Sequence, residues 1–513
     1  MTIKVILLII FFGTMFLVGM YTRKHATNVN DFVLGGRTVG PWLTAFAYGT
    51  SYFSAVVFVG YAGQFGYKYG IASTWIGIGN ALIGSLLAWV VLGRRTRIMS
   101  NHLSVTTMPD FFGKRYESRA LRVTASAIAF IFLIPYTASV YNGLSRLFGM
   151  AFDIPYVVCV IAMATLTCAY VLMGGYMATA INDFIQGIIM LGGIVAVVAA
   201  VVNGKGGFME AVKSLAAIES DVPVTLGQQG AFTSFFGPDP LNLLGVIILT
   251  SLGTWGLPQM IHKFYAIKDE KSIKSGAVIS TVFAVVVSGG CYFLGGFARL
   301  FDTVAIHNTD GSVIYDAIIP SMLSSLPDIL VGIVIVLVLS ASMSTLSALV
   351  LTSSSTLTLD FLKDNIIKDM NDKKQLLWMR MLLVFFVVIS VILAINPPTF
   401  IAQLMGISWG ALAGAFLAPF LYGLYWKGTT KAAVWISFLS GVGITVSNLM
   451  FKYITSPINA GAIAMVSGLI LVPIVSLMTP KLRKDYINKV FSCYQEEVIV
   501  EKKNALPETK RKR

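Results

Sequence analysis

The sequence predicts an all-α integral membrane protein, and three observations lead to this fold class. Of the 513 residues, 56% are hydrophobic and only 12% are charged. A soluble domain carries about 25% charged residues and cannot bury so much apolar surface. The apolar residues also form runs long enough to cross a bilayer, and the basic residues lie between these runs. The chain is therefore expected to lie in lipid, before any motif is considered.

A transmembrane helix needs about 20 mostly apolar residues to cross the hydrocarbon core of a bilayer. By this criterion the chain contains about 13 spans, near residues 4–22, 41–65, 72–93, 121–150, 155–174, 178–202, 240–263, 275–300, 328–358, 377–396, 399–426, 431–452 and 459–479. Residues 1–479 are thus predicted to form one transmembrane domain. Residues 480–513 are charged, contain no apolar span and are expected to form a basic, solvated tail.

The net charge of +14 does not indicate nucleic acid as a partner, because the basic residues are confined to certain segments. They cluster around residues 94–122, 263–274 and 363–380, whereas the loops after residue 203 and at 301–327 carry few. This alternation is the positive-inside pattern, which predicts that every second loop is cytoplasmic. In this interpretation Lys263 belongs to a cytoplasmic basic segment.

Two separate observations predict the orientation of the chain. The first apolar run is followed, rather than led, by its strongest positive charge, Arg23 and Lys24, which places the N-terminus outside. An odd number of spans that ends in a basic cytoplasmic C-terminus gives the same orientation. We therefore expect a multi-pass protein of the plasma membrane that contacts the lipid bilayer and has no obligate protein partner.

Two of the predicted spans contain helix-weakening residues in mid-membrane. The second span holds Tyr48-Gly49-Thr50-Ser51, and the seventh holds the segment from Ser251 to Pro258. Gly lowers helix stability and Pro removes a backbone hydrogen bond, so both helices are expected to break at these points. Paired broken helices in corresponding halves of a chain point to the binding site of a transporter. The alternative is that these are ordinary helix contacts through small residues.

A cluster of hydroxyls, from Ser340 to Ser347, lies deep in the predicted span 328–358. Ser344 and Thr345 follow Ala341 by three and four residues, so their oxygens share one helix face near the carbonyl of Ala341. A dehydrated hard cation takes several oxygen ligands, many of them neutral. The hydroxyls and the free carbonyls of Thr50 and Phe53 would supply such ligands, and they favour sodium because none of them titrates. The alternative is that the hydroxyls bond only their own helix.

Asp183 is an acidic residue at the start of a long apolar helix. An ionisable group near the membrane interior is a functional hypothesis by default. Its other role would be to stabilise the positive N-terminus of the helix. Both interpretations stay open at this point.

Several motifs occur in the order known from one transporter family. They are Phe32-Val33-Leu34-Gly35-Gly36-Arg37, Gly40-Pro41-Trp42, Gly174-Gly175, Asn182-Asp183-Phe184-Ile185-Gln186, Pro258, Ser340 to Ser347 with Asp360, and Gly414 through Pro419 with Gly423, Trp426 and Lys427. On these motifs the chain resembles the sodium:solute symporter family, nearest the branch of the bacterial sodium/proline and sodium/pantothenate symporters. The resemblance extends from about the first span to the last.

The resemblance implies an inverted repeat of two five-helix halves, at about 41–202 and 240–426, with discontinuous first and sixth core helices. It implies a main sodium site with these ligands: Thr50, Phe53, Ala341, Ser344 and Thr345. In members with a second sodium, or along the path by which sodium leaves, the matching positions are Asp183 and Ser347. Ala348 replaces a hydroxyl that members with the full second site carry.

The resemblance also implies a substrate pocket, made of Ser51, Tyr52, Ser54, Tyr136, Thr250, Thr254 and Trp255. Tyr136 matches a substrate-side tyrosine of the family. Tyr52 stands where proline carriers have an acid, and Thr250 and Thr254 stand where they have aromatic residues. Val57 replaces the glutamine of sugar carriers, which argues against a sugar. An amino acid such as proline, or a small carboxylate such as pantothenate, stays open as the solute.

The function that we expect is import of a small organic solute, coupled to sodium, by alternating access. Coupling to protons is the alternative, since Asp183 titrates. A membrane solute sensor is a more distant one, because the tail leaves no room for a signalling kinase. Enzyme activity is not expected, because the four histidines are scattered and form no acid–base cluster.

Overall fold

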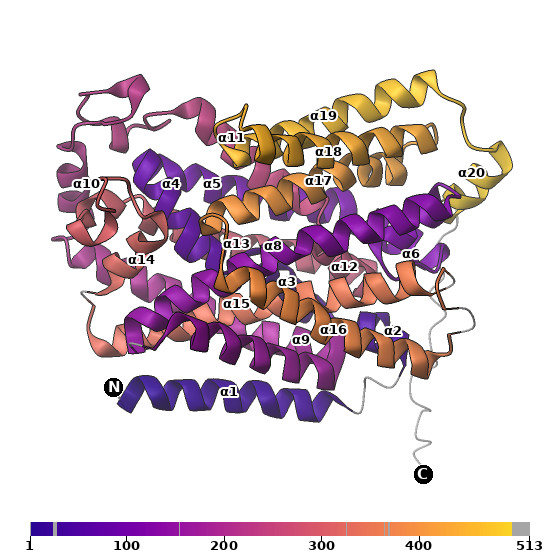
Figure 1. The fold of residues 1–513 in the computed structure, drawn as a ribbon, viewed down its shortest axis with the longest axis horizontal. Helices are drawn as coiled ribbons and strands as arrows, with labels where there is room; N and C mark the ends of the chain where they lie inside the picture. The colour runs from indigo at the N-terminus through magenta and orange to yellow at the C-terminus, as the bar shows by residue number, and fades with distance from the viewer. Residues whose placement is uncertain are drawn as a thin grey trace, which may run out of the picture.

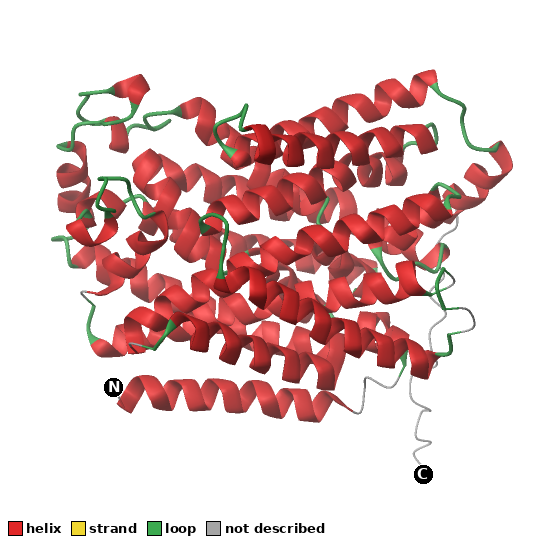
Figure 2. Cartoon of the chain, viewed as in Figure 1, coloured by secondary structure: helices red, strands yellow, loops and turns green. Residues whose placement is uncertain are grey.

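The structure, a computed structural model, describes residues 2–23, 28–152, 154–324, 326–363, 365–367 and 370–494. Within these ranges the chain forms a bundle of helices that run roughly side by side (Figures 1 and 2). The described residues form no β-strand and only three isolated bridges, one of which joins Val39 to Ile267. The predicted all-α class is confirmed.

The α-helices differ widely in length. In chain order they are α1 (Thr2–Thr22), α2 (Val29–Leu34), α3 (Pro41–Tyr52), α4 (Ala62–Tyr69), α5 (Thr74–Gly79), α6 (Arg94–His102), α7 (Met108–Arg115), α8 (Arg119–Phe152), α9 (Tyr156–Asn203), α10 (Phe208–Ala216), α11 (Pro240–Leu252), α12 (Pro258–Ala266), α13 (Glu270–Gly295), α14 (Tyr315–Ser324), α15 (Asp328–Thr356), α16 (Asp372–Ile395), α17 (Ile401–Tyr425), α18 (Lys431–Phe451), α19 (Pro457–Met478) and α20 (Lys484–Phe491).

Short π-helical and 3₁₀ segments connect or extend several of these helices. The π-helical segments are Val56–Tyr61, Asn80–Leu87, Trp89–Gly93 and Leu357–Leu362. The 3₁₀ segments are Gly35–Arg37, Gly70–Ser73, Pro223–Thr225, Ala231–Thr233, Gly253–Trp255, Ala298–Phe301, Val304–Ile306 and Ser492–Tyr494.

The predicted count of about 13 spans is not confirmed. Among the described residues, ten helical stretches are long and apolar enough to cross a membrane, or eleven when the bent pair Pro240–Trp255 and Pro258–Ala266 is one span. Two of the ten, Val56–His102 and Tyr156–Asn203, contain 47 and 48 residues. A straight helix of that length would extend roughly 70 Å, more than twice the hydrocarbon core of a bilayer.

A glycine with positive φ interrupts each of these two stretches. Gly70 has φ 61° and Gly175 has φ 55°, a conformation that residues with a Cβ rarely adopt. Gly70 lies between the predicted spans 41–65 and 72–93, and Gly175 lies between 155–174 and 178–202. The sequence prediction ends one span and begins another at each of these glycines, whereas the count from continuous helices treats each stretch as one span. The two counts of spans therefore differ here.

Proline residues and polar caps fix where several helices begin. Pro41, Pro240 and Pro258 each stand in the first turn of a helix, where the missing N–H costs nothing. The Asp269 carboxylate accepts a hydrogen bond from the Ser272 amide at 2.7 Å and caps α13. These signals are local, so the sequence alone specifies them.

Helix α15 lies inside the bundle, between α3 and α9, and α1 lies at the edge of the bundle (Figure 1). In the stretch Asp328–Leu362, 78% of an apolar 18-residue segment is buried within the protein. In the stretch Ile3–Thr22 of α1, the buried share of such a segment is 17%. Helix α15 packs against α3, α8, α9 and α16, and α3 also packs against α12 and α13. Hydroxyls on α15 therefore face other helices and not lipid.

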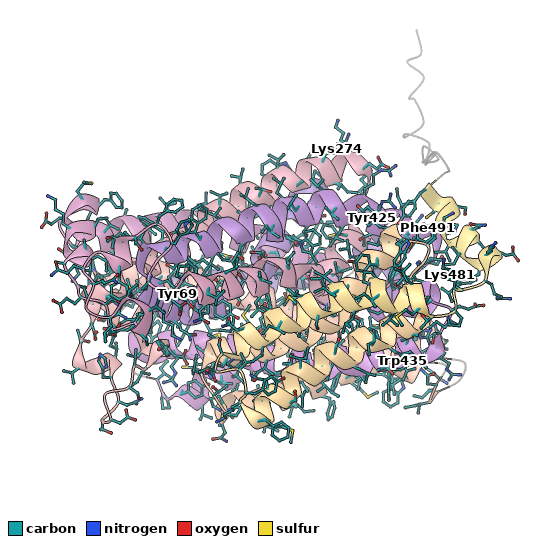
Figure 3. All side chains as sticks on the ribbon, turned by 90° about the horizontal axis from the view of Figure 1, so that it is seen from above. Tyr69, Lys274, Tyr425, Trp435, Lys481 and Phe491 are labelled. Atoms are coloured by element: carbon teal, nitrogen blue, oxygen red, sulfur yellow. The ribbon has the colours of Figure 1, made fainter. Side chains whose placement is uncertain are left out.

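The start of the first helix and the last helix lie at opposite ends of the bundle. In Figure 1, α1 begins at the left end and runs along the lower edge, and α20 lies at the right end. Figure 3 shows the basic residues Lys274 and Lys481 toward the end of the bundle that lies opposite Tyr69.

The start of the predicted solvated tail is packed against the protein. Val490 and Phe491 of α20 are 1% and 6% exposed, and the guanidinium of Arg115 lies 5.0 Å from the centre of the Phe491 ring. The prediction missed this amphipathic helix because eight residues are too few to give a clear periodic signal. Residues 495–513 of the predicted tail lie outside the described residues.

We predict that Gly175→Ala lowers the thermal stability of the purified protein. A Cβ at Gly175 would lie 2.7 Å from the carbonyl oxygen of Phe32, in addition to the positive φ, and such strain costs roughly 1–3 kcal/mol. Gly192→Ala on the same helix is the control, because a Cβ there meets no atom within 4 Å. Thermal unfolding in detergent measures both, and equal melting temperatures of the two variants would contradict the assigned backbone break.

Candidate sodium and solute site

Helix α3 corresponds to the first core helix that the resemblance implies, and it breaks a few residues later than the sequence predicts. The regular hydrogen bonds of α3 end where the Phe53 amide donates to the Gly49 carbonyl at 3.1 Å. Gly49 and Thr50 are still helical, and the next helical segment begins after Ser54, whose carbonyl accepts from Val57 at 3.0 Å. A Cβ on Gly49 would lie 2.4 Å from the ring of Phe283. Gly49 therefore provides space for a neighbouring ring and does not itself break the helix.

Helices α11 and α12 together correspond to the sixth core helix that the resemblance implies, and the break between them lies where the sequence predicts. Helix α11 ends at Leu252, the 3₁₀ turn Gly253–Trp255 comes next, and α12 begins at Pro258 with a bend of 41°. The proline starts a new helix because it cannot donate the hydrogen bond that would continue the old one. Both core helices that the resemblance implies to be discontinuous are thus interrupted.

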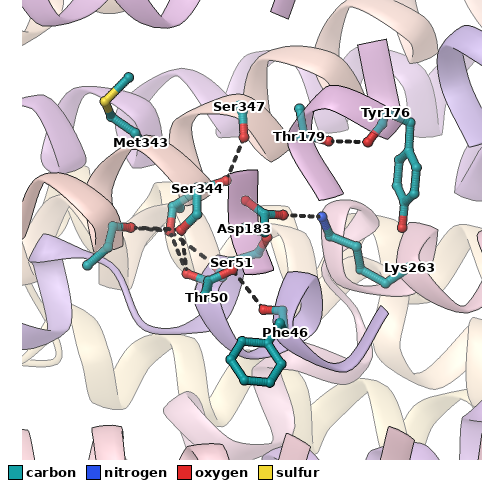
Figure 4. Close-up of polar contacts among 12 residues, drawn as sticks. Phe46, Thr50, Ser51, Tyr176, Thr179, Asp183, Lys263, Met343, Ser344 and Ser347 are labelled. Atoms are coloured by element: carbon teal, nitrogen blue, oxygen red, sulfur yellow. Dashed lines mark hydrogen bonds and ion pairs between the residues drawn. The ribbon is translucent and has the colours of Figure 1, made fainter. Parts of the chain in front are cut away.

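The break in α3 leaves a carbonyl that α15 meets with two hydroxyls (Figure 4). Ser344 Oγ donates to the Thr50 carbonyl at 2.9 Å, and Thr345 Oγ1 lies 3.3 Å from the same oxygen. Both hydroxyls also lie within 3.2 Å of the Ala341 carbonyl. The predicted ligands Thr50, Ala341, Ser344 and Thr345 are therefore brought together, and all four residues are buried.

Phe53 is the one predicted sodium ligand on α3 or α15 that takes part in no hydrogen bond from the α15 hydroxyls among the described residues. Its ring stacks on Tyr52, with centres 4.2 Å apart. The hydroxyl of Ser342 on α15 bonds only its own helix, since it donates to the Val338 carbonyl at 2.7 Å. The alternative that the hydroxyls bond only their own helix therefore holds for Ser342, and it does not hold for Ser344 or Thr345.

The oxygens that converge here suit an alkali cation. They are carbonyls and hydroxyls, without a carboxylate or a titratable nitrogen among them, and hard cations bind such neutral oxygens. The site lies inside the protein, where a helix carbonyl without its own amide partner needs another ligand. The donor set therefore fits sodium.

Asp183, predicted as part of a second site, forms a buried ion pair that the sequence did not reveal. Its Oδ2 lies 3.5 Å from Nζ of Lys263, and the two side chains are 0% and 2% exposed. Lys263 does not lie in an exposed basic loop between spans, as the sequence analysis expected, because every residue of α12 is buried within the protein. The signal was available: Pro258 starts a helix, so Lys263 lies in its middle. Ser347 donates to the Ser344 carbonyl at 2.9 Å.

The residues predicted to form the substrate pocket are all buried, and they fall into two groups. Ser51, Tyr52, Ser54 and Tyr136 lie around the break in α3, and Thr250, Thr254 and Trp255 lie at the break after α11. The Tyr52 hydroxyl joins the groups by donating to the Thr250 carbonyl at 2.6 Å. Thr254 and Trp255 donate instead to the carbonyls of Gly84 and Ile83, at 3.2 and 3.0 Å.

Trp409 on α17 completes this group, and the sequence analysis missed it. Its ring lies 6.1 Å from that of Tyr52 and 5.9 Å from that of Tyr136. The Trp409 indole nitrogen, the Tyr136 hydroxyl and the Ser51 hydroxyl have no hydrogen-bond partner among the described residues. Buried polar groups without a partner are costly, so these three atoms are candidates to bind a solute. An aromatic residue in an apolar span gives no sequence signal of this contact.

These observations first define a class of protein. An all-helical membrane bundle in which two interrupted helices meet at buried polar groups is a secondary transporter. The sequence profile of the sodium:solute symporter family then matches residues 32–441. The chain belongs to the sodium:solute symporter family, and it couples movement of a solute to sodium.

Curated relatives match over nearly the whole chain. The osmoregulated proline transporter OpuE of Bacillus subtilis (strain 168) is 28% identical over 502 residues, which cover 94% of this chain and 96% of the relative. The sodium/proline symporter of Staphylococcus aureus (strain JH9) is 30% identical over 502 residues, with 93% and 92% covered.

Solved structures support the fold. A Na⁺-coupled sialic acid symporter in a substrate-bound outward-open state superposes with a TM-score of 0.71 at 16% identity, covering 94% of this chain and 99% of that one. Mhp1, a nucleobase-cation-symport-1 family transporter in a closed conformation, gives a TM-score of 0.54 at 12% identity, with 90% and 97% covered.

We predict that Tyr52→Phe raises the solute concentration needed for half-maximal uptake. The variant loses the bond to the Thr250 carbonyl, which joins the two interrupted helices. Tyr422→Phe is the matched control, because it removes a similar bond, from the Tyr422 hydroxyl to the Leu469 carbonyl at 2.9 Å, between α17 and α19. Each variant is expected to lose about 1 kcal/mol of stability. Uptake kinetics decide: an unchanged half-saturation in Tyr52→Phe would show that this bond does not shape the pocket.

Proposed function

We propose that this protein is a sodium-coupled symporter that imports an amino acid such as proline, or a small carboxylate such as pantothenate, across the plasma membrane by alternating access. One observation carries the proposal. The hydroxyls of Ser344 and Thr345 on α15 converge on the Thr50 carbonyl at the break in α3. The proposed sodium ligands are those of the sequence analysis: Thr50, Phe53, Ala341, Ser344 and Thr345.

Sodium and solute binding are coupled in this proposal because they share helix α3. Sodium bound at the Thr50 carbonyl fixes the end of α3 against α15. The next residues of α3, Ser51 and Tyr52, line the proposed solute pocket, which the sodium thereby completes. The other proposed pocket residues are Ser54, Tyr136, Thr250, Thr254, Trp255 and Trp409.

The driving force is adequate for accumulation with one sodium per solute. Movement of one charge through about 100 mV releases about 2.3 kcal/mol. A tenfold sodium gradient adds about 1.4 kcal/mol. Together these terms support roughly 500-fold accumulation of a neutral solute.

Proline is the first candidate solute. The two curated relatives carry proline in their names. The Trp409 ring lies 6.1 Å from the Tyr52 ring and 5.9 Å from the Tyr136 ring, and an aromatic group of this kind suits a small apolar ring. Uptake in proteoliposomes, with and without a sodium gradient, across proline, other amino acids, pantothenate and short carboxylates identifies the solute. If a proton gradient without sodium drives uptake of every candidate as well as a sodium gradient does, the proton-coupled alternative is favoured.

The orientation and the exit route complete the proposal. We propose that the N-terminus lies outside and the C-terminus lies in the cytoplasm, since α1 begins at one end of the bundle and α20 lies at the other (Figure 1). We place Asp183 and Ser347 beside the route by which sodium leaves, because Ser347 lies one helical turn beyond Ser344. Nothing in this cycle makes or breaks a covalent bond, so no enzyme activity is proposed.

We predict that Thr345→Ala abolishes sodium-dependent uptake, or raises at least tenfold the sodium concentration that supports half-maximal uptake. Loss of one ligand weakens a site built from neutral oxygens. Ser342→Ala is the control, since it removes a hydroxyl from the same helix that bonds only the Val338 carbonyl. Uptake is measured against sodium concentration at fixed ionic strength. A wild-type sodium response in Thr345→Ala would show that the ligand assignment is wrong.

A further inference from the structure

Lys263 is a buried charged group for which the proposed transport cycle has no role. Its ammonium lies 3.5 Å from the Asp183 carboxylate and 5.4 Å from the centre of the Tyr176 ring. Figure 4 draws the pair beside the Thr50 and Ser344 contacts. The pair joins α9 to α12, the second half of the broken sixth core helix, and both side chains are buried.

A carboxylate buried in this way requires a positive partner. An uncompensated charge in a low-dielectric interior is strongly unfavourable. Two cations are available in principle, a second sodium or an ammonium group of the protein itself. Lys263 is the one basic side chain that forms an ion pair with Asp183 among the described residues.

The oxygens that would complete a sodium shell on the α15 side of Asp183 are scarce. The Ser347 hydroxyl donates to the Ser344 carbonyl at 2.9 Å, and the next residue, Ala348, has no hydroxyl. A sodium ion bound there would also lie close to the Lys263 ammonium, and the two like charges would repel each other.

We propose that Lys263 is the resident counter-ion of Asp183 and stands in place of a second sodium, so that the protein binds a single sodium in each cycle. The inference deepens the proposed function, on which it rests for the main sodium site. Among the described residues Lys263 forms its ion pair with Asp183 and none with the main sodium ligands. In this proposal it acts through Asp183, so it is a positioning residue that determines ion stoichiometry.

The surroundings of Asp183 also predict the effect of removing the ammonium. Asp183 Oδ1, Asn182 Oδ1 and Gln186 Oε1 are buried oxygens on about one turn of α9, and none has a hydrogen-bond partner among the described residues. Carboxylate and amide oxygens are ligands of hard cations. Without Lys263, Asp183 is therefore expected to recruit a sodium ion.

The test counts radioactive sodium ions bound per molecule of the full-length protein, purified in detergent, without solute. We expect one in the wild type, two in Lys263→Met and one in the double variant Asp183→Asn/Lys263→Met. Methionine is unbranched and fills irregular space, so it replaces the lysine stem without a charge. Lys268→Gln, which removes an exposed positive charge five residues further on, is the control and should bind one.

Three results would overturn the inference: two sodium ions in the wild type, the same number in Lys263→Met as in the wild type, or fewer in the double variant than in the wild type. The double variant leaves no buried ion unpaired, so it decides the question when Lys263→Met does not fold. A double variant that binds one sodium fewer than the wild type would show that Asp183 holds sodium beside Lys263. A wild type that binds none, with one in Lys263→Met, would contradict the main sodium site and leave the inference standing.

Discussion

The carbonyl of Thr50 is the atom on which the arrangement depends. It is the first carbonyl of α3 that its own helix does not satisfy, and inside a membrane such a group must find another partner. The hydroxyls of Ser344 and Thr345 meet it from α15, at 2.9 and 3.3 Å. In the proposed cycle a sodium ion is coordinated by these oxygens. Binding or release of the ion therefore changes how strongly α3 and α15 are held together.

The surrounding structure buries this contact. Helix α15 is largely buried among other helices, and its hydroxyls do not face lipid. Tyr52, two residues beyond Thr50, extends from the same break to the carbonyl of Thr250 and connects the first broken core helix to the sixth. A single short segment thus contacts the ion site on one side and the aromatic group of Tyr136 and Trp409 on the other, which is the connection that coupling requires.

Local signals were enough to predict much of this, and long-range contacts explain the rest. The break before Pro258 was predicted because proline acts on its own helix, and the pairing of Ser344 and Thr345 with Ala341 results from helix periodicity. The break in α3 was placed a few residues early, since Gly49 provides room for Phe283 from a distant helix. Lys263 was assigned to a cytoplasmic segment because its partner, Asp183, lies 80 residues away in the sequence. Trp409 was missed for the same reason.

Hydrogen–deuterium exchange of the purified protein, in sodium and in potassium at equal ionic strength, tests the central claim most directly. If sodium ties the end of α3 to α15, the amides of residues 51–58 exchange more slowly in sodium than in potassium, while those of α18 and α19, which lie apart from the site, are unaffected. Exchange in residues 51–58 that is the same in both salts would contradict the claim.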